Sequence, residues 1–284
     1  MIWRAIWIVA LALLVTGCTG NFVYNRLDTL TGWYLRSLVS LDDGQRAQLQ
    51  DWLTQTLAWH RQSELNRYAQ FLRELSGQLS QPAAAVDSGH DLAGYELAQH
   101  RFEVFWDDLA AKISPDAARL LLSLSPAQVN ELLANMEEKS RKRAAEADDA
   151  DEWRRDQVRG LTRQVKRWTG SVSAPQKALI AATVAQVEPT QAEWLESQHN
   201  WQSALRQSLN DAAAGDSAAG RIQQLLTQPQ TQWSAQYTQK ERRNRQRYLQ
   251  LIASLDVSLT SQQRLRLRAE LLKLARQFAT IAQE

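Results

Sequence analysis

The chain has 284 residues, a net charge of +2 and a single cysteine. This length is enough for one large domain or two small ones with a real hydrophobic core, and one cysteine leaves no partner for an internal disulfide. A near-zero net charge argues against bulk nucleic-acid binding, which requires a strongly basic face. We therefore expect no nucleic-acid partner, and we expect stability to come from packing.

The first 17 residues have the parts of a secretory signal. A short start with one positive charge at Arg4 precedes an uninterrupted apolar run over residues 5–15. A helix rises about 1.5 Å per residue, so this run falls far short of the ~30 Å that a spanning helix must cover. Residues 1–17 are therefore predicted to be a cleaved signal peptide, and residues 18–284 the helical mature domain.

The segment Val15-Thr16-Gly17-Cys18 follows the apolar run and resembles the lipobox of bacterial lipoproteins. The resemblance implies cleavage between Gly17 and Cys18 and acylation of the Cys18 thiol. Two or more acyl chains hold a protein stably on a bilayer. Thr19 in place of Asp favours the outer membrane in such lipoproteins, with the chain facing the periplasm. The alternatives are an ordinary signal peptide with a stray cysteine, or an uncleaved N-terminal anchor.

Every long segment after Cys18 has helical character. Ala, Leu, Gln, Arg and Glu are abundant, and no run of alternating apolar and polar residues is long enough for a strand. We predict an all-α protein of long antiparallel helices in a bundle. The expected helices span residues 21–39, 43–80, 91–112, 126–168 with a break near 148–149, 174–187, 190–213, 218–255 with a disturbance at Pro229, and 261–282, and residues 82–90 form a loop.

Side-chain spacing predicts which faces of these helices are buried. In the first helix Leu27, Leu30 and Tyr34 fall near one face, and an apolar stripe with steps of three and four continues along residues 49–79. Pro115 and Pro126 are each expected in the first turn of a helix, where proline is tolerated. Most aromatic residues are expected in the core, although a groove lined by some of them would suit extended peptide or acyl chains.

A short helix-start pattern recurs four times. In each case Asp, Ser or Thr is followed three residues later by Gln, which is the composition of a capping box. The first side chain accepts a hydrogen bond from the third amide of the helix, and the Gln side chain accepts one from the cap amide. The four segments are residues 41–45, 124–128, 172–176 and 259–263.

The spacing of the four boxes suggests an internal repeat. Leu41 and Val172 lie 131 residues apart, and Leu124 and Leu259 lie 135 apart. This predicts two related halves of about 130 residues, with pseudo-repeats over 41–140 and 172–282. Coincidence is the alternative, because capping boxes are common and the sequences between them match poorly.

Several short segments resemble a family of uncharacterised, helical proteobacterial lipoproteins, a domain of unknown function. The likeness is clearest over about residues 18–80 and implies a lipoprotein with a helical fold, without catalytic residues to carry over. A looser likeness, through the Leu-Thr-x-x-Gln helix start, is to small periplasmic chaperones of the envelope-stress response. The segments that carry the family resemblance are Tyr24-Asn25-Arg26-Leu27-Asp28, Trp33-Tyr34-Leu35, Trp59-His60-Arg61, Glu64-Leu65 and Tyr68-Ala69.

His60 and Glu64 are the one pair that suggests chemistry. They stand four residues apart on an otherwise apolar helix face. A buried His–Glu pair is suited to acid–base work or to metal ligation, although zinc requires three or four converging groups. The alternative, which we favour, is a polar pair whose hydrogen bonds are satisfied inside the core. No phosphate-binding loop, metalloprotease motif or nucleophile elbow is present.

A dense basic segment lies near the C-terminus. On a helix it would present several guanidinium groups, which suit the phosphates of lipid or lipopolysaccharide. The alternative is a solvated helix face. The candidate residues for this anionic-ligand patch are Arg242, Arg243, Arg245 and Arg247.

The leading functional hypothesis is a membrane-tethered envelope lipoprotein that acts as a non-enzymatic, periplasm-facing binding or scaffold module. We expect no cofactor and no metal, and the expected partners are the membrane itself, envelope proteins or anionic lipid head groups. A periplasmic holdase that cradles unfolded chains is the first alternative. An enzyme using His60 and Glu64 is the second.

Overall fold

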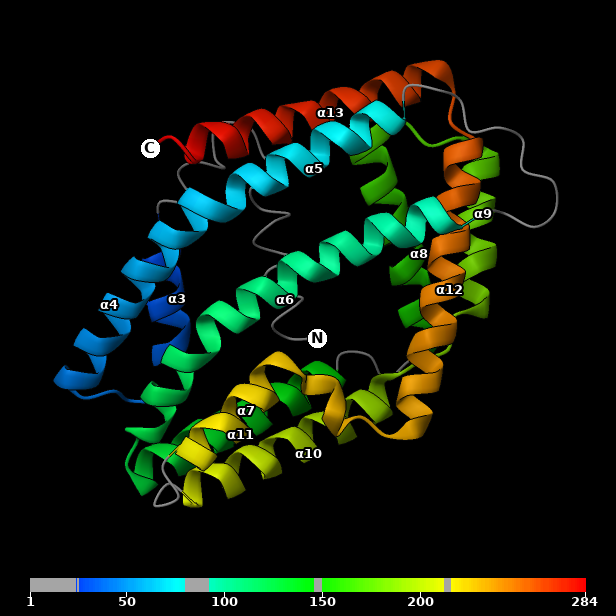
Figure 1. The fold of residues 1–284 in the computed structure, drawn as a ribbon. Coiled ribbons are helices and arrows are strands. Elements are labelled where there is room, and N and C mark those ends of the chain that lie inside the picture. Colours follow the sequence, from blue (N-terminus) through cyan, green and yellow to red (C-terminus); the bar gives the residue numbers. More distant parts are fainter. Residues whose placement is uncertain (1–23, 25, 80–91, 146–149, 212–215) are drawn as a thin grey trace.

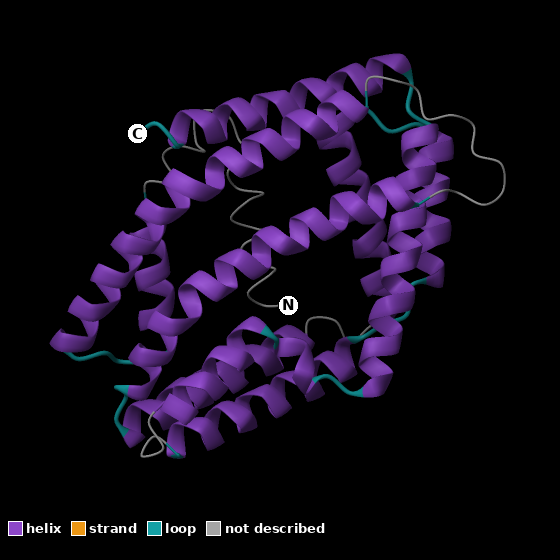
Figure 2. Cartoon of the chain, viewed as in Figure 1, coloured by secondary structure: helices purple, strands orange, loops and turns teal. Residues whose placement is uncertain are grey.

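The computed structural model describes residues 24, 26–79, 92–145, 150–211 and 216–284. Within these ranges every regular element is a helix and there is no strand, which confirms the all-α fold class (Figures 1 and 2). The elements are α3 (Leu27–Arg36), α4 (Asp43–Trp59), the π-helical turn η1 (His60–Glu64), α5 (Leu65–Gln78), α6 (Ala93–Leu122), α7 (Pro126–Ala145), α8 (Ala150–Thr169), α9 (Ala174–Gln186), α10 (Gln191–Asn210), α11 (Asp216–Thr227), the 3-10 turn η3 (Pro229–Gln232), α12 (Ala235–Val257) and α13 (Ser261–Ile281).

The helices form the sides of an open, four-cornered frame, and α6 crosses it (Figure 1). Along one side α5 and α13 run antiparallel. Two contacts show this orientation: Arg268 donates to the Ser76 carbonyl at one end, and the rings of Tyr68 and Phe278 meet further along. α6 runs antiparallel to α12, where the Tyr95 hydroxyl donates to Asp256. The predicted loop over 82–90 lies outside the described residues.

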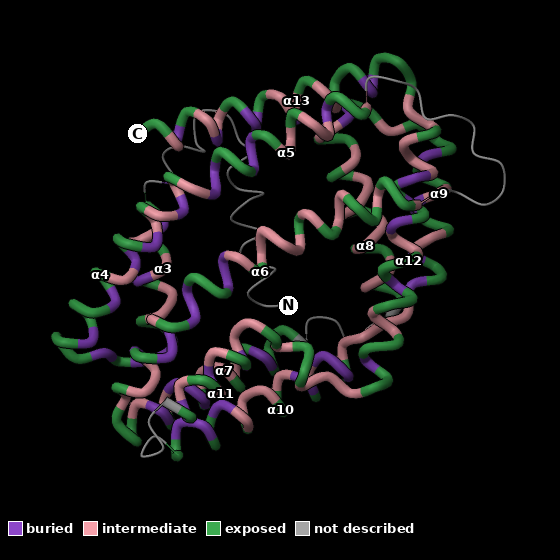
Figure 3. Tube along the Cα trace, in the orientation of Figure 1, coloured by how far each residue is buried: buried purple, intermediate pink, exposed green. Residues whose placement is uncertain are grey.

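Four apolar clusters of buried residues hold the frame together (Figure 3). The buried residues of each cluster come from two to four helices that meet there. Representative buried pairs are Leu65 with Phe278 between α5 and α13, Leu49 with Leu120 between α4 and α6, Leu205 with Ile222 between α10 and α11, and Ile180 with Leu251 between α9 and α12.

All four predicted capping boxes are present. Asp42, Ser125, Ser173 and Thr260 each accept a hydrogen bond from the amide of the Gln three residues later, and each Gln side chain accepts one from the cap amide. These bonds satisfy amides that a helix start otherwise leaves without partners. The boxes therefore set where α4, α7, α9 and α13 begin.

Two of the capping glutamines bind each other at one corner of the frame, where α4 and α7 begin. The Gln45 amide donates to the Oε1 atom of Gln128 at 3.2 Å, and Gln128 donates back to Gln45 at 2.7 Å. Gln45 also donates to the Ser123 carbonyl, and Gln128 donates to the Ser40 carbonyl. Each glutamine thus caps its own helix and binds the chain that enters the other one. We call this reciprocal arrangement a glutamine clasp.

A second glutamine clasp repeats the same exchange where α9 and α13 begin, at the opposite corner of the frame (Figure 1). Gln176 and Gln263 exchange hydrogen bonds of 3.0 and 2.9 Å, and they donate to the carbonyls of Ser258 and Ser171. Both glutamines are buried. The partners lie 87 residues apart, compared with 83 in the first clasp.

The likeness of the two halves is strong at these corners and weak between them. The first clasp brackets α4, η1, α5 and α6, whereas the second brackets α9, α10, α11, η3 and α12. An internal repeat over 41–140 and 172–282 therefore stays a prediction, which the matched corners favour.

The π-helical turn at His60–Glu64 keeps the buried stripe of α4 and α5 on one side. Buried residues follow at steps of four from Thr56 through His60 and Glu64 to Tyr68. In a regular α-helix each step of four overshoots a full turn by about 40°, so the stripe would wind around the helix. A π turn holds one extra residue and absorbs this drift. The predicted helix over 43–80 is thus one continuous rod over 43–78 with a widened turn inside it.

Pro115 is inside α6, and the predicted helix start there is wrong. Proline lacks the N–H that would bond to the carbonyl four residues earlier, which is that of Ala111. The Ser114 hydroxyl donates to this carbonyl at 3.3 Å and supplies the missing partner. Pro126 does begin α7, as expected, and Pro229 begins the 3-10 turn that separates α11 from α12.

Most of the predicted face of the first helix is buried or half-buried, and Leu30 is the exception. Leu27 is buried as expected, but Leu30 is 49% exposed and Trp33 is 68% exposed. The helix packs through Leu27 against the cluster between α5 and α13, and through Tyr34 and Leu35 against the cluster at the start of α4.

Replacing Gln176 with Ala tests the importance of the second clasp. The change removes five side-chain hydrogen bonds and leaves the amide group of buried Gln263 without its full set of partners, so we expect the free energy of unfolding to fall by about 3 kcal/mol. Urea unfolding followed by circular dichroism measures the loss. Gln250→Ala, at an exposed position in α12, is the control and should change it by less than about 0.5 kcal/mol. Equal effects of the two variants would contradict a special role for the clasp.

Candidate functional site

The predicted lipidation site lies outside the described residues. Gly17, Cys18 and the signal segment 1–17 all precede Tyr24, where the structural description begins. In the described ranges no helix is long and apolar enough to cross a membrane.

His60 and Glu64 are buried in the π-helical turn. The Tyr24 hydroxyl lies 2.9 Å from Nδ1 of His60, within hydrogen-bonding distance, and the two rings are stacked. Tyr68 packs edge-on against the imidazole on another side. Arg61 lies over the Tyr24 ring with its guanidinium carbon 5.4 Å from the ring centroid.

Among the described residues Glu64 makes its hydrogen bonds with Arg67 and none with His60, its predicted partner. Arg67 donates to both carboxylate oxygens of Glu64 at 2.9 Å and also forms an ion pair of 2.7 Å with Asp108 on α6. The buried carboxylate is thus compensated by a guanidinium from its own helix. This chain of contacts ties α5 to α6.

The environment of His60 favours its neutral form. Burial lowers the pKa of His60 from 6.5 to about 4, and burial also raises the pKa of Tyr24 to about 12. His60 and Glu64 do not line an open cleft, and no group of three metal-ligating side chains occurs in the described part of the chain. Burial of both side chains favours the polar-pair interpretation, and the role of the pair stays a prediction.

The Arg-rich segment of α12 clamps the connection between α9 and α10. Arg243 donates two hydrogen bonds of 2.7 Å to the Glu188 carboxylate, and Arg247 adds a third of 2.8 Å. These bonds lower the pKa of Glu188 to about 2. The buried Asn244 side chain bonds to both the amide and the carbonyl of Glu188. Arginine and asparagine thus hold one residue of the neighbouring connection.

Two further members of the predicted anionic-ligand patch differ from each other. Arg245 forms an ion pair of 2.8 Å with Glu103 on α6, whereas Arg242 is exposed to solvent. Three of the four predicted arginines therefore already contact a carboxylate. Binding of an anionic ligand by this segment stays a prediction, and the contacts shown are those that join α12 to its neighbours.

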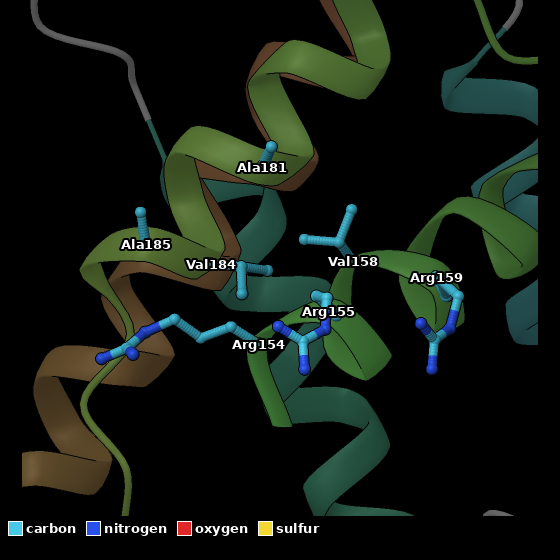
Figure 4. A pocket seen from close by; sticks show the side chains of 7 residues that line it. All are labelled: Arg154, Arg155, Val158, Arg159, Ala181, Val184 and Ala185. Atoms are coloured by element: carbon cyan, nitrogen blue, oxygen red, sulfur yellow. The ribbon is translucent and has the colours of Figure 1, made fainter. Parts of the chain in front are cut away.

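A shallow groove of about 370 Å³ lies between α8 and α9 (Figure 4). Its floor includes the buried Val184, and three arginines surround it. Arg154 and Arg159 pair with aspartates on their own helix, while Arg155 is exposed and has no ion-pair partner among the described residues. Such a groove offers an apolar surface with cations at its rim. The lining residues are Arg154, Arg155, Val158, Arg159, Ala181, Val184 and Ala185.

Two features escaped the sequence analysis although each has a readable signal. Serine stands two residues before every capping residue, at positions 40, 123, 171 and 258, and its carbonyl is the one that the opposite glutamine binds. The second feature is Trp33. All nine tryptophans from Trp33 onward are described, and Trp33 alone is exposed.

Comparison with protein families gives one match, over residues 37–238. The chain belongs to the family of unknown function DUF6279. The matched part of DUF6279 contains the whole first clasp, the His60–Glu64 turn and Gln176 of the second clasp. Cys18, α3 and the Arg-rich part of α12 lie outside it. Neither the curated proteins nor the solved structures gave a match to the chain.

The burial of His60 predicts a stability loss in mild acid. An unfolded His60 takes up a proton near pH 6.5, whereas the folded one does so near pH 4. The unfolded chain therefore binds more protons than the folded chain between these two pH values. As the pH decreases through this window, the free energy of unfolding decreases as well. We expect His60 to account for a loss of about 2 kcal/mol between pH 7.5 and pH 5.

Urea unfolding at the two pH values measures this loss in the wild type and in His60→Gln. The variant should lose about 2 kcal/mol less than the wild type over the same interval. His199→Gln, at an exposed histidine on α10, is the control and should keep the wild-type difference. An unchanged pH dependence in His60→Gln would show that the imidazole is not the titrating group.

Proposed function

We propose that this DUF6279 member is a lipid-anchored lipoprotein of the cell envelope that acts as a non-enzymatic binding or scaffold module facing the periplasm. The anchoring rests on the lipobox-like segment that ends at Cys18 and on the short apolar run before it. The resemblance of segments within residues 24–69 to helical proteobacterial lipoproteins supports the same proposal, and Thr19 favours the outer membrane.

The observation that carries the scaffold role is how the described residues use their buried polar groups. Buried polar groups join parts of the chain that are far apart in the sequence. Examples are the two clasps, the Tyr24–His60 contact, the Glu64–Arg67–Asp108 chain and the Asn244 contacts. Satisfied polar groups of this kind fix one arrangement of the helices. A rigid frame of long helices on a tether suits the holding of other molecules at the membrane.

The groove between α8 and α9 gives the binding role a location. An apolar floor bordered by arginines suits a ligand that has a short apolar part and an acidic group, such as the head-group end of an acidic lipid. The holdase alternative is supported by exposed apolar residues on other helices. Leu97 and Phe102 lie on α6 and Ile252 lies on α12, and suppression of client aggregation by the purified protein would test them.

Replacing Cys18 with Ala tests the anchoring. With no thiol to acylate, we expect incorporation of a labelled fatty acid to be lost and the precursor with residues 1–17 to accumulate. Labelling, followed by gel electrophoresis and membrane fractionation, measures both. Thr19→Ser keeps the lipobox and is the matched control, with normal labelling expected. A Cys18→Ala chain that is cleaved normally and released as a soluble product would refute the proposal.

A further inference from the structure

One side of α3 is an exposed surface whose composition is unusual for this chain. The side chains that face solvent recur at steps of three and four, namely Arg26, Leu30, Trp33 and Arg36. The two apolar side chains lie at its centre, 49% and 68% exposed, and the two arginines lie at its ends. We call this surface the α3 outer face.

The orientation of the α3 outer face is fixed by the other side of the helix. Leu27 packs with Leu65 and Phe278 in the cluster between α5 and α13. Tyr34 and Leu35 pack against a second cluster at the start of α4. Because α3 is held at both ends, Trp33 cannot turn inward without disrupting two clusters.

A further cation borders the α3 outer face from a neighbouring helix. Lys139 of α7 is exposed, donates to the Ser37 hydroxyl at 2.7 Å and lies 4.5 Å from the centroid of the Tyr34 ring. Lys139 thus adds a cation at the Ser37 end of this face, where exposed Arg36 precedes Ser37 in the sequence. Aromatic and apolar side chains with lysine and arginine around them are typical of surfaces that lie at the boundary between lipid head groups and acyl chains.

The position of α3 in the sequence indicates that the bilayer covers the α3 outer face. Eight residues separate Cys18 from Leu27, the first residue of α3. Even a fully extended connection of that length spans only about 30 Å. If Cys18 carries lipid, as proposed above, this helix cannot lie far from the bilayer surface.

We propose that the α3 outer face seats the protein on an anionic phospholipid surface. Trp33 and Leu30 enter the region between head groups and acyl chains, and Arg36 and Lys139 bind lipid phosphates. The bilayer contact then fixes how the whole frame stands on the membrane. This inference rests on the proposed function for its tether and adds a second, side-chain attachment.

The test uses the full-length protein purified from membranes and reconstituted in vesicles of phosphatidylethanolamine and phosphatidylglycerol. Trp33→Cys introduces a thiol that carries an environment-sensitive fluorophore. Leu265→Cys is the matched control, because Leu265 is an apolar residue with 64% exposure on α13. We expect a blue-shifted emission at position 33 and loss of most of its fluorescence when the lipids carry nitroxide quenchers. The label at position 265 should keep an aqueous emission and resist quenching.

The outcomes separate this inference from the proposed anchor. The mass of the Cys18 peptide shows independently whether the chain carries lipid. If it does, an aqueous emission at position 33 overturns the inference and leaves the anchor intact. If it does not, the same labelled chain is added to the vesicles, where a blue shift at position 33 supports the face without the anchor and its absence overturns it.

Replacing phosphatidylglycerol by phosphatidylcholine should weaken the quenching, and an unchanged value would contradict the role of Arg36 and Lys139.

Discussion

The exchange of hydrogen bonds between paired glutamines is the interaction on which the rest of the structure depends. A primary amide has both a carbonyl oxygen and an NH₂ group, so one glutamine can accept from its own cap amide and donate to its partner. Serine, aspartate or threonine at the same position offers less reach. Each clasp joins two helix starts and two incoming segments, which fixes a corner of the frame with two side chains.

With the corners held by polar contacts, the apolar residues need to fill only the places where helices touch. This explains why the buried apolar residues form four local clusters. It also explains the use of ion pairs such as Arg245 with Glu103, which join α12 to α6 across the frame. Ion pairs thus contribute to the contacts between helices.

Local signals in the sequence were enough to predict where helices begin. They were not enough to predict which residues the capping glutamines bind. The capping boxes depend on residues three apart, so Asp42 with Gln45 was predictable. The pairing of Gln45 with Gln128 joins positions 83 apart and becomes visible only once the chain is folded. The predicted helix start at Pro115 was wrong for a related reason. The Ser114 hydroxyl binds the Ala111 carbonyl that Pro115 leaves without a partner, and no sequence pattern predicts this bond. The exposure of Leu30 was missed because the pattern of Leu27, Leu30 and Tyr34 does not say which neighbours the helix has.

The widened turn at His60–Glu64 has a consequence for how the chain can change over time. It sets the rotational phase between α4, which packs near Leu49, and α5, which packs near Leu65. Loss of a single residue there would restore a regular helix and turn every later side chain of α5 by about 100° relative to α13. Substitutions at exposed positions of the rod would leave that phase untouched. In this stretch natural selection is thus expected to preserve the number of residues more strictly than their identity.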